Sequence, residues 1–275
     1  MKSYLKTKDF SVSQEEFELL HNKDFDMLVT QPAPKDLDSY YKSESYISHT
    51  DSKKTLIDKV YQLVKRFSLW RKINLISTYI KSPRTLLDIG AGTGDFLVTA
   101  ANRKWIVEGV EPNHDARKRA QEKGVELKND IASLSDKKFK VITLWHVLEH
   151  LPDLENQIKK ITSLVDEDGV LVIAVPNFKS YDAEYYHDFW AAYDVPRHLW
   201  HFSRTAIEKL FLKHGMQIIK TKPMIFDAFY VALLSEKYKF GKSNFFKAFW
   251  IGIRSNISAW RSKEYSSIIY ILKKA

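Results

Sequence analysis

The chain has 275 residues, of which 44% are hydrophobic, so it can bury the core of one large domain or of a domain with a cap. It contains no cysteine, which excludes disulfides, thiolate nucleophiles and cysteine-ligated zinc. The N-terminus lacks the apolar stretch of a signal peptide, and no apolar run approaches the length of a membrane span. We therefore expect a cytoplasmic protein.

The net charge of +9 is concentrated near the C-terminus. Between Glu236 and Lys274, nine Lys and Arg residues stand against two Glu, so this segment holds +7 of the total. An anionic partner is therefore expected to meet the C-terminal region, while the rest of the chain is close to neutral.

Residues 1–50 show no strong periodicity and are expected to form an N-terminal cap of short elements. Residues 51–275 are expected to form the main domain. Its first helix is predicted from apolar residues that recur every three or four positions between Leu56 and Phe67. A second helix, at about 70–80, is expected to end before a proline, because the residue ahead of a proline avoids the helical region.

From residue 84 the sequence alternates between strand and helix patterns. This alternation predicts an α/β fold: a Rossmann-like, doubly wound, mostly parallel sheet of seven strands with helices on both faces. The strands are expected at about 84–89, 105–110, 125–128, 139–145, 170–175, 216–221 and 266–272, and the helices at about 94–103, 113–123, 153–164 and 204–214. Two insertions interrupt the pattern: an aromatic segment at 177–202, and a helical one at 223–264.

A glycine-rich loop, Asp88-Ile-Gly-Ala-Gly-Thr-Gly-Asp95, follows the first strand of this pattern. In such strand–loop–helix units, backbone N–H groups and a helix N-terminus meet a ligand at close range. A dinucleotide-binding loop needs a third glycine where this chain has Asp95. Asp88, just ahead of the loop, would repel a pyrophosphate but suits a cationic group such as an ammonium. The loop therefore indicates a ligand other than a dinucleotide.

Acidic residues also follow the next two strands. Glu111 lies 23 residues after Asp88, where doubly wound folds place the acid that binds both ribose hydroxyls. Asp130 and Ile131 follow the third strand, where they can receive an adenine amino group and cover the face of the base. Together with the loop, they predict a site for a nucleoside that carries a cationic group.

These ordered motifs resemble those of the class I S-adenosylmethionine-dependent methyltransferases from about residue 50 to the end. The resemblance rests on Leu-Asp88-Ile-Gly-Ala-Gly-Thr-Gly94, Gly-Val-Glu111-Pro, Asn-Asp130, Ile-Thr-Leu-Trp-His146-Val-Leu-Glu-His150 and Val-Pro176-Asn. A later segment, Asp194-Val-Pro-Arg-His-Leu-Trp-His-Phe-Ser203, is similar to one in a broad subgroup allied to quinone-ring O-methyltransferases.

The resemblance implies S-adenosylmethionine as the cofactor. It implies that Asp88 and the glycine loop hold the methionine part, that Glu111 binds the ribose, and that the residues around Asp130 bind the adenine. The residues expected to bind the cofactor are Asp88, Gly90, Ala91, Gly92, Gly94, Glu111, Pro112, Asn113, Asp130, Ile131, Trp145 and His146.

The segment from His146 to His150 also has the H-x-x-E-H spacing of an inverted zinc-protease motif. Zinc would need both histidines on one helix and a third ligand. Here a strand pattern leads directly into His146, and Pro152 follows closely, so that helix is short or missing. We therefore expect no metal. The resemblance to the family implies that His146 lies at the end of the fourth strand, next to the cofactor's methyl group. His150 is expected to have a structural role, hydrogen-bonded beneath the loop.

The aromatic insertion at 177–202 is expected to act as a substrate lid, because apolar walls with a few polar groups are typical of small-molecule pockets. His146 and His198 are the candidate catalytic bases. The expected substrate contacts are Tyr46, Tyr193, Asp194 and Arg197, with Arg197 as a clamp on a carboxylate or phosphate. The alternative is that Asp194 and Arg197 pair to pin the loop while the aromatic residues belong to the core.

A helix at about 244–260 is expected to carry one apolar stripe, formed by Phe246, Phe249, Trp250, Ile253, Ile257 and Trp260. A basic amphipathic helix of this kind can lie on an anionic membrane. Alternatively, the stripe packs against the domain or against a second subunit.

We predict transfer of a methyl group from S-adenosylmethionine to a small-molecule or lipid-like acceptor, with O-methylation favoured. The alternative is a non-catalytic S-adenosylmethionine-binding module that acts on RNA or a membrane through its basic C-terminal region. The fourth strand ends in Leu-Trp-His-Val, whereas enzymes that methylate base amines in nucleic acid carry Asn/Asp-Pro-Pro-aromatic there, which argues against a nucleic-acid substrate. The sequence leaves the acceptor and the oligomeric state open.

Overall fold

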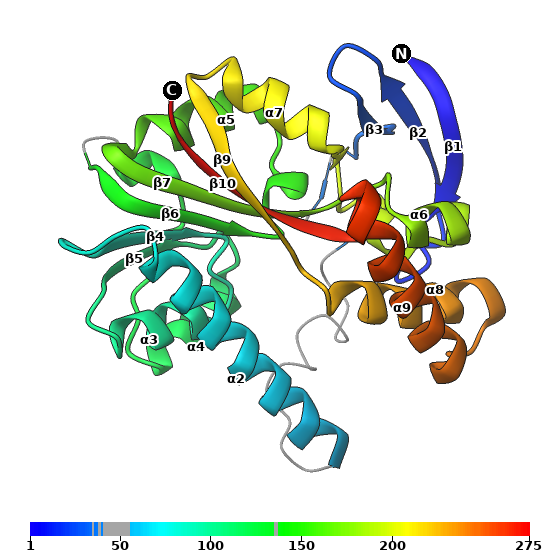
Figure 1. Cartoon of the computed structure of the whole chain (residues 1–275), viewed down its shortest axis with the longest axis horizontal. Helices are drawn as coiled ribbons and strands as arrows, with labels where there is room; N and C mark the ends of the chain where they lie inside the picture. Colours follow the sequence, from blue (N-terminus) through cyan, green and yellow to red (C-terminus); the bar gives the residue numbers. More distant parts are fainter. Residues whose placement is uncertain (35, 38–39, 41–55, 135–136) are drawn as a thin grey trace. The chain divides into compact units, whose positions relative to one another are not determined.

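The computed structural model describes the chain except for residues 35, 38–39, 41–55 and 135–136 (Figure 1). Tyr46, a predicted substrate contact, lies outside the described residues. The chain divides into two compact units, each built from several segments. Unit 1 comprises Met1–Ser43, His146–Leu154 and Ala174–Tyr270, and unit 2 comprises Glu44–Trp145, Glu155–Ile173 and Ile271–Ala275. Residues 1–43 thus group with later parts of the chain.

The main sheet has six strands, in the order β5-β4-β6-β7-β10-β9. Their bounds are Ile106–Val110 (β5), Thr85–Ile89 (β4), Phe139–Trp145 (β6), Val165–Pro176 (β7), Ser267–Lys274 (β10) and Met216–Pro223 (β9). β4 pairs in parallel with both β5 and β6. Most residues of β4, β6 and β7 are buried, as expected for strands of a parallel sheet that is covered on both faces. The predicted α/β fold is confirmed.

One of the seven predicted strands, the third along the chain at 125–128, does not form. Lys128 makes one isolated parallel bridge to Val110, in which its N–H donates to Gly109 and its carbonyl accepts from the N–H of Glu111. A single bridge is too short a pairing to continue as a strand, so this segment ends beside β5 without extending the sheet.

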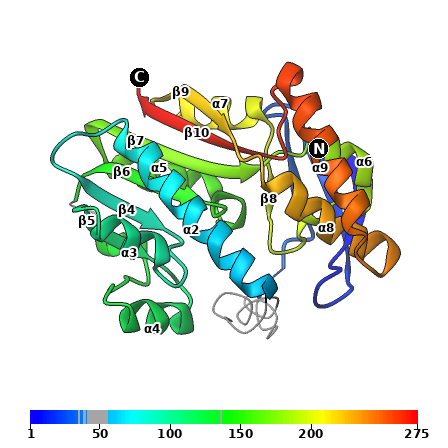
Figure 2. The same cartoon turned by 60° about the horizontal axis from the view of Figure 1, so that its bottom comes forward.

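Three helices follow the predicted positions closely. They are α3 (Asp95–Ala101), α4 (His114–Glu122) and α5 (Leu154–Ser163), and α3 and α4 lie beside one another in both ribbon views (Figures 1 and 2). Asn113 caps α4 by accepting the N–H of Ala116. Instead of the two predicted helices, α2 runs unbroken over Leu56–Ser77, because no glycine or proline separates them.

Unit 1 contains a second, antiparallel sheet, in the order β1-β2-β3-β8. Its strands are Lys2–Lys8 (β1), Glu16–Asn22 (β2), Met27–Gln31 (β3) and Trp200–His201 (β8). The sequence analysis expected only short cap elements in this region. The missed signal is the polar–apolar alternation around Phe17 and Leu19, whose side chains are both buried.

The remaining helices of unit 1 are α6 (Tyr181–Tyr186), α7 (Arg204–Leu212), α8 (Asp227–Phe240) and α9 (Phe245–Ser262). Ser180, Ser203 and Asn244 cap α6, α7 and α9 by accepting a backbone N–H three residues later. Among the described residues, no helix is long and apolar enough to cross a membrane.

Candidate cofactor and acceptor sites

The glycine loop has the backbone geometry that the sequence predicted. Gly90, Gly92 and Gly94 all have positive φ angles, of 70°, 54° and 76°, a region that side-chain-bearing residues rarely adopt. The N–H groups of Gly90 and Ala91 both donate to the carbonyl of Val110, at 2.8 and 3.0 Å, which ties the loop to the end of β5. A Cβ at Gly92 would have no atom within 4 Å, so the loop backbone is open to a ligand there.

Glu111 links the loop to the start of α4. Its Oε2 accepts the N–H of Gly92 and its Oε1 accepts the N–H of Asn113, both at 2.9 Å. Each carboxylate oxygen can accept a further hydrogen bond. Glu111 therefore holds the loop in place and retains capacity for two hydroxyl donors, which is what the predicted ribose contact requires.

Asp88 is a buried carboxyl at the end of β4. Its Oδ1 accepts the hydroxyl of Thr143 at 2.5 Å. Burial raises the pKa of Asp88 to about 7, although the Thr143 hydrogen bond and the charge of Lys72 act in the opposite direction. A desolvated carboxylate of this kind is stabilised when a cation binds beside it. Its environment therefore suits the ammonium that the sequence analysis assigned to it.

Trp145, the last residue of β6, has a buried Nε1 without a hydrogen-bond partner among the described residues. Its ring meets the edge of Phe96, and the Nζ of Lys72 lies 4.3 Å from its centroid. Buried donors in native proteins are normally paired, so this N–H fits a site that a ligand completes.

Asp130 is exposed and accepts the N–H of Ala132, and Ile131 is buried beside it. The open loop, the buried carboxyl and the orphaned donor fit the predicted cofactor.

Residues 60–221, more than half of the chain, match a family model described as a methyltransferase domain. The chain belongs to this methyltransferase family. Membership confirms the resemblance to class I S-adenosylmethionine-dependent methyltransferases and, through the family, the predicted cofactor. The glycine loop, Glu111 and Asp130 all lie inside the matched residues.

Curated relatives of this methyltransferase include ubiquinone biosynthesis O-methyltransferases. The protein of Actinobacillus pleuropneumoniae serotype 5b (strain L20) is 32% identical over 108 residues, which cover 34% of this chain and 46% of that protein. The protein of Aeromonas salmonicida (strain A449) is 34% identical over 104 residues, covering 34% and 44%. The chain thus matches less than half the length of these relatives.

Solved structures share the fold of the methyltransferase. Magnesium protoporphyrin IX methyltransferase from Synechocystis PCC 6803, with bound SAH, has a TM-score of 0.57 at 15% identity and covers 86% of this chain and 97% of its own. Because the identity is low, this likeness shows the fold alone.

His146 follows β6 directly and lies between two carboxylates of unit 1. Its Nε2 is 3.1 Å from Asp227 Oδ2 and its Nδ1 is 3.4 Å from Glu149 Oε1. Burial alone would lower the pKa of His146, but the two carboxylates outweigh burial and raise it to about 10. His146 is therefore an imidazolium near neutral pH, and it must lose that proton before it can act as the predicted base.

His198 and His150 each form a hydrogen bond to a backbone carbonyl through Nδ1. Nδ1 of His198 is 2.9 Å from the carbonyl of Ala192, and Nδ1 of His150 is 3.0 Å from the carbonyl of Arg197. A carbonyl can only accept, so each Nδ1 donates its proton to that carbonyl, and Nε2 of His198 lies 4.0 Å from Asp194 Oδ2. Burial and the neighbouring His198 lower the pKa of His150 to about 4. In His198, Nε2 is therefore the nitrogen that is left to exchange a proton with an acceptor.

Glu149, His150 and His198 could also hold a metal ion. Each offers one ligand atom, and these three atoms lie within 4.8 Å of one another. A bound ion would draw them closer, because zinc–nitrogen bonds measure about 2.0–2.1 Å. Sequence spacing could not reveal this group, since His198 lies far along the chain from the other two. The sequence expectation of no metal stays a prediction.

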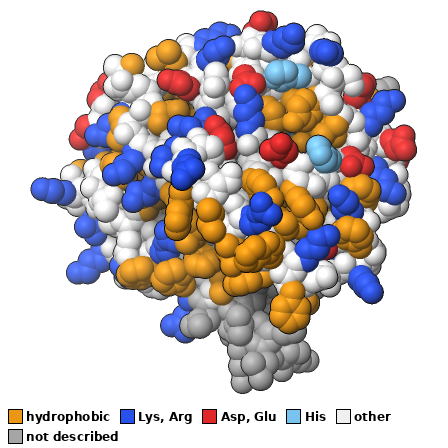
Figure 3. Space-filling model, turned by 45° about the vertical axis from the view of Figure 1, so that its right-hand side comes forward, with side chains coloured by type: hydrophobic (Ala, Val, Ile, Leu, Met, Phe, Trp, Pro, Cys, Tyr) orange, Lys and Arg blue, Asp and Glu red, His pale blue; other side chains and the backbone are white. Residues whose placement is uncertain are grey.

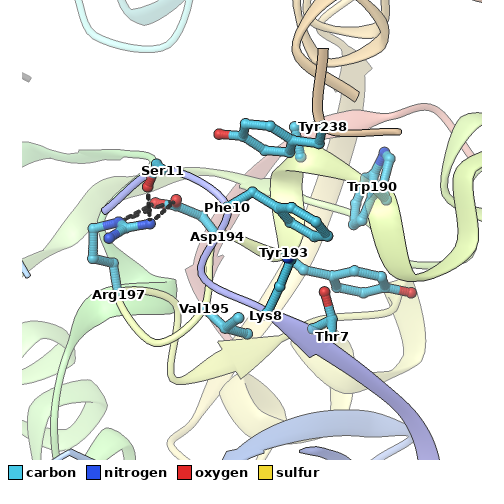
Figure 4. A pocket seen from close by; sticks show the side chains of 11 residues that line it. Thr7, Lys8, Phe10, Ser11, Trp190, Tyr193, Asp194, Val195, Arg197 and Tyr238 are labelled. Carbon is cyan, nitrogen blue, oxygen red and sulfur yellow. Dashed lines mark hydrogen bonds and ion pairs between the residues drawn. The ribbon is translucent and has the colours of Figure 1, made fainter. Parts of the chain in front are cut away.

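Arg197 is only 2% exposed, and its donors are occupied within unit 1. Its Nε donates to both oxygens of Asp194, at 3.1 and 3.0 Å, and its Nη2 donates to Ser11 at 2.6 Å (Figure 4). Its Nη2 also donates to Asp9 at 2.9 Å. The predicted substrate clamp would have to break these bonds. The geometry supports the alternative, in which Arg197 and Asp194 pin the loop.

The aromatic wall predicted at 177–202 lies in the core of unit 1. Tyr186, Trp190 and Tyr193 are each at most 2% exposed, and Trp190 and His201 both pack edge-on against Tyr193. The cavity beside Trp190 and Tyr193 measures about 10 Å³ (Figure 4), room for about one water molecule. Tyr193 is therefore a packing residue here, rather than the predicted substrate contact.

Asp182 is a buried residue that the sequence analysis did not single out. Its Oδ2 accepts from Trp190 Nε1 and from the hydroxyl of Ser266, and its Oδ1 accepts from the hydroxyl of Ser255. One carboxylate thus fastens the aromatic segment to α9 and to the start of β10. Nothing in the local pattern signals this, because Ser255 and Ser266 lie 73 and 84 residues further on.

Proposed function

We propose that this methyltransferase moves a methyl group from S-adenosylmethionine to a hydroxyl oxygen of a small-molecule or lipid-like acceptor. The observation that carries the proposal is the buried Asp88 carboxyl beside an open glycine loop, inside the family-matched residues. The printed names of the relatives, which are O-methyltransferases of ubiquinone biosynthesis, support an oxygen acceptor, and also an acceptor with lipid character.

In this proposal the residues of unit 2 bind and orient the cofactor, which supplies an activated methyl group when bound. Asp88 receives the ammonium, Glu111 accepts the ribose hydroxyls, and the residues around Asp130 meet the adenine. Orientation can supply roughly 7–11 kcal/mol of a reaction barrier. Because methyl transfer from a sulfonium disperses positive charge, these residues have little to do beyond positioning and excluding water.

Residues of unit 1 serve the acceptor. We assign the proton-accepting role to Nε2 of His198, because its Nδ1 already carries a proton that is donated to Ala192. A positioned base of this kind contributes about 10²–10⁴-fold to the rate. His146, held as an imidazolium by Asp227 and Glu149, places a positive charge at the end of β6, where it can stabilise an acceptor oxygen as it loses its proton.

Calorimetry with S-adenosylhomocysteine, followed by turnover assays with labelled S-adenosylmethionine and a panel of phenolic and catecholic acceptors, tests the proposal. We expect binding of S-adenosylhomocysteine, and labelled methyl ethers from at least one acceptor class. Absence of binding would contradict the cofactor assignment. Binding without turnover across hydroxyl, amine and carbon acceptors would favour the non-catalytic module instead.

A further inference from the structure

Helix α9 exposes its large side chains and buries its small ones. The residues on its buried face are Ala248, Ile251, Gly252, Ser255 and Ala259. On the opposite face, Phe246 is 92% exposed and Trp260 is 66% exposed, with Phe249, Trp250 and Ile257 each more than half exposed between them. A surface helix of a globular protein normally has the reverse arrangement. The apolar stripe found in the sequence is therefore not the face that packs on the protein.

The contacts on the small-residue face hold α9 in this orientation. A Cβ at Gly252 would lie 2.5 Å from the ring of Phe229 on α8, so the two helices are packed too closely for a larger residue. The hydroxyl of Ser255 donates to the buried Asp182, and the amide of Asn256 donates to the carbonyl of Ile225. Turning the aromatic stripe inward would break all of these contacts.

Helix α8 extends the same exposed surface. Phe226, Tyr230 and Phe240 are each about half exposed or more, and the rings of Phe229 and Phe249 lie 5.4 Å apart between the two helices. Figure 3 looks toward the side of the molecule that carries α8 and α9 in Figure 1, and shows hydrophobic side chains gathered with Lys and Arg among them. An exposed aromatic area of this extent marks an interaction surface.

The charges of this region select an anionic partner. Residues 237–263 contain seven Lys and Arg and no Asp or Glu. On α9, Lys247, Arg254 and Arg261 are spaced seven residues apart, and they directly follow Phe246, Ile253 and Trp260. A seven-residue spacing keeps side chains on one side of a helix. A basic row therefore runs along the aromatic row for nearly the whole helix.

We propose that α8 and α9 form a docking surface for an anionic lipid bilayer. Phe and Trp side chains enter the interface between headgroups and acyl chains, and adjacent Lys and Arg side chains meet the phosphates. Neither helix is long and apolar enough to span a membrane, so they lie along its surface. Both helices follow the family-matched residues 60–221. This docking surface goes beyond the proposed methyl transfer and does not depend on it.

Vesicle co-sedimentation of the full chain tests the proposal. We expect binding at low salt to vesicles of phosphatidylcholine with phosphatidylglycerol, and much weaker binding to phosphatidylcholine alone or at high salt, because the charge attraction is screened. Absence of binding to the anionic vesicles at low salt would overturn the proposal. So would equal binding to both vesicle types, since the basic row would then have no function.

Two sets of variants separate the apolar and electrostatic contributions. The triple variant Phe246→Ser, Trp250→Ser and Trp260→Ser should weaken vesicle binding at least roughly tenfold. Its control is Ile106→Ser with Leu212→Ser, two exposed apolar residues outside the surface, which should leave binding unchanged.

The double variant Arg254→Gln and Arg261→Gln should weaken binding by about fivefold per charge. Its control, Lys118→Gln with Lys159→Gln, removes two exposed charges elsewhere.

Calorimetry with S-adenosylhomocysteine shows whether each variant is folded, and it separates failure of this proposal from failure of the cofactor assignment. Sedimentation equilibrium without lipid tests for a second copy: a dimer that the triple aromatic variant dissociates would overturn the lipid assignment. A single-stranded RNA retained by the wild type and lost in the same variants, without vesicle binding, would likewise assign the surface to nucleic acid.

Discussion

Asp88 and His146 show how burial and neighbouring charge set the chemistry of single residues in this protein. Burial raises the pKa of Asp88 to about 7, so a cation that binds beside Asp88 stabilises its charged form. Burial acts against the charge of His146 too, but Asp227 and Glu149 outweigh it and raise its pKa to about 10. Of the two histidines predicted as bases, His198 is thus the better candidate, because its Nδ1 donates to the carbonyl of Ala192 and it is not the residue held between Asp227 and Glu149.

Replacing Asp88 with Asn should stabilise the fold above neutral pH and weaken cofactor binding. The raised pKa means that folded Asp88 holds its proton between about pH 4 and 7, where the unfolded chain has lost it, so wild-type stability falls across this window. The stability gain of Asp88→Asn should grow to roughly 4 kcal/mol above that window.

Urea unfolding at about pH 4 and about pH 8 measures the stability gain of Asp88→Asn, and calorimetry measures the affinity for S-adenosylhomocysteine, which should fall roughly tenfold or more. The exposed variant Asp130→Asn is the control for stability. A gain in stability that does not depend on pH would contradict the assignment.

Replacing Asp227 with Asn should lower the pKa of His146 by roughly 1–3 pH units, because one of its two anionic partners is lost. In the wild type, the His146 contribution to stability is fully present below the pKa of an unfolded histidine, and it is lost as pH rises through about 10. Asp227→Asn should therefore cost stability near neutral pH and little above about pH 10. NMR titration of the imidazole measures the pKa directly. An unchanged titration curve would rule out the ion pair.

At the level of secondary-structure elements, hydrogen bonds connect the aromatic segment 177–202 to several other elements of unit 1. Its Arg197 reaches Asp9 at the end of β1, and its Tyr186 donates to the buried Glu236 of α8. Asp182 connects the same segment to α9. The predicted lid is therefore part of the core of unit 1.

Asp182→Ala should destabilise unit 1 by on the order of 3–5 kcal/mol, because it leaves the Trp190 N–H and two serine hydroxyls buried without an acceptor. Thermal and urea unfolding measure the loss. The nearby exposed variant Glu184→Ala should stay within about 0.5 kcal/mol of the wild type. Comparable losses in the two variants would show that the buried network is not the cause.

At the scale of the whole molecule, the proposed cofactor residues belong to unit 2 and the proposed acceptor residues to unit 1. Affinity for the cofactor and turnover should therefore be separable by mutation. His198→Ala should lower turnover about 10²–10⁴-fold and leave the affinity for S-adenosylhomocysteine unchanged. The exposed variant His114→Ala is the control. Loss of cofactor affinity in His198→Ala, or wild-type turnover, would remove the assignment.

Methyl transfer should survive removal of metal ions, because the transition state disperses the positive charge of the sulfonium and needs no further cation. Turnover before and after dialysis against a chelator, with metal analysis of the purified protein, checks this expectation. If turnover were lost on chelation and restored by a divalent ion, the ion would be placed at Glu149, His150 and His198. His198 would then be a metal ligand, and it could not also be the proposed base.

Short-range patterns in the sequence predicted the local features of this protein. The strand that ends near Asp88 and the glycine loop that follows it could be predicted, because both depend on backbone geometry over a few residues. The same local periodicity also showed that α9 has an apolar stripe. The polar–apolar alternation of β2 was equally local but was overlooked.

The partners of side chains that lie far apart along the chain could not be predicted from the sequence. Arg197 meets Asp9 at a separation of 188 residues, so no spacing rule could tell a substrate clamp from a structural ion pair. Likewise, the periodicity of α9 identifies two faces but does not say which one is buried. The small-residue face is buried because Gly252 packs closely against Phe229 and Ser255 donates a hydrogen bond to Asp182. These contacts involve residues far away in the sequence, so helical periodicity cannot predict them.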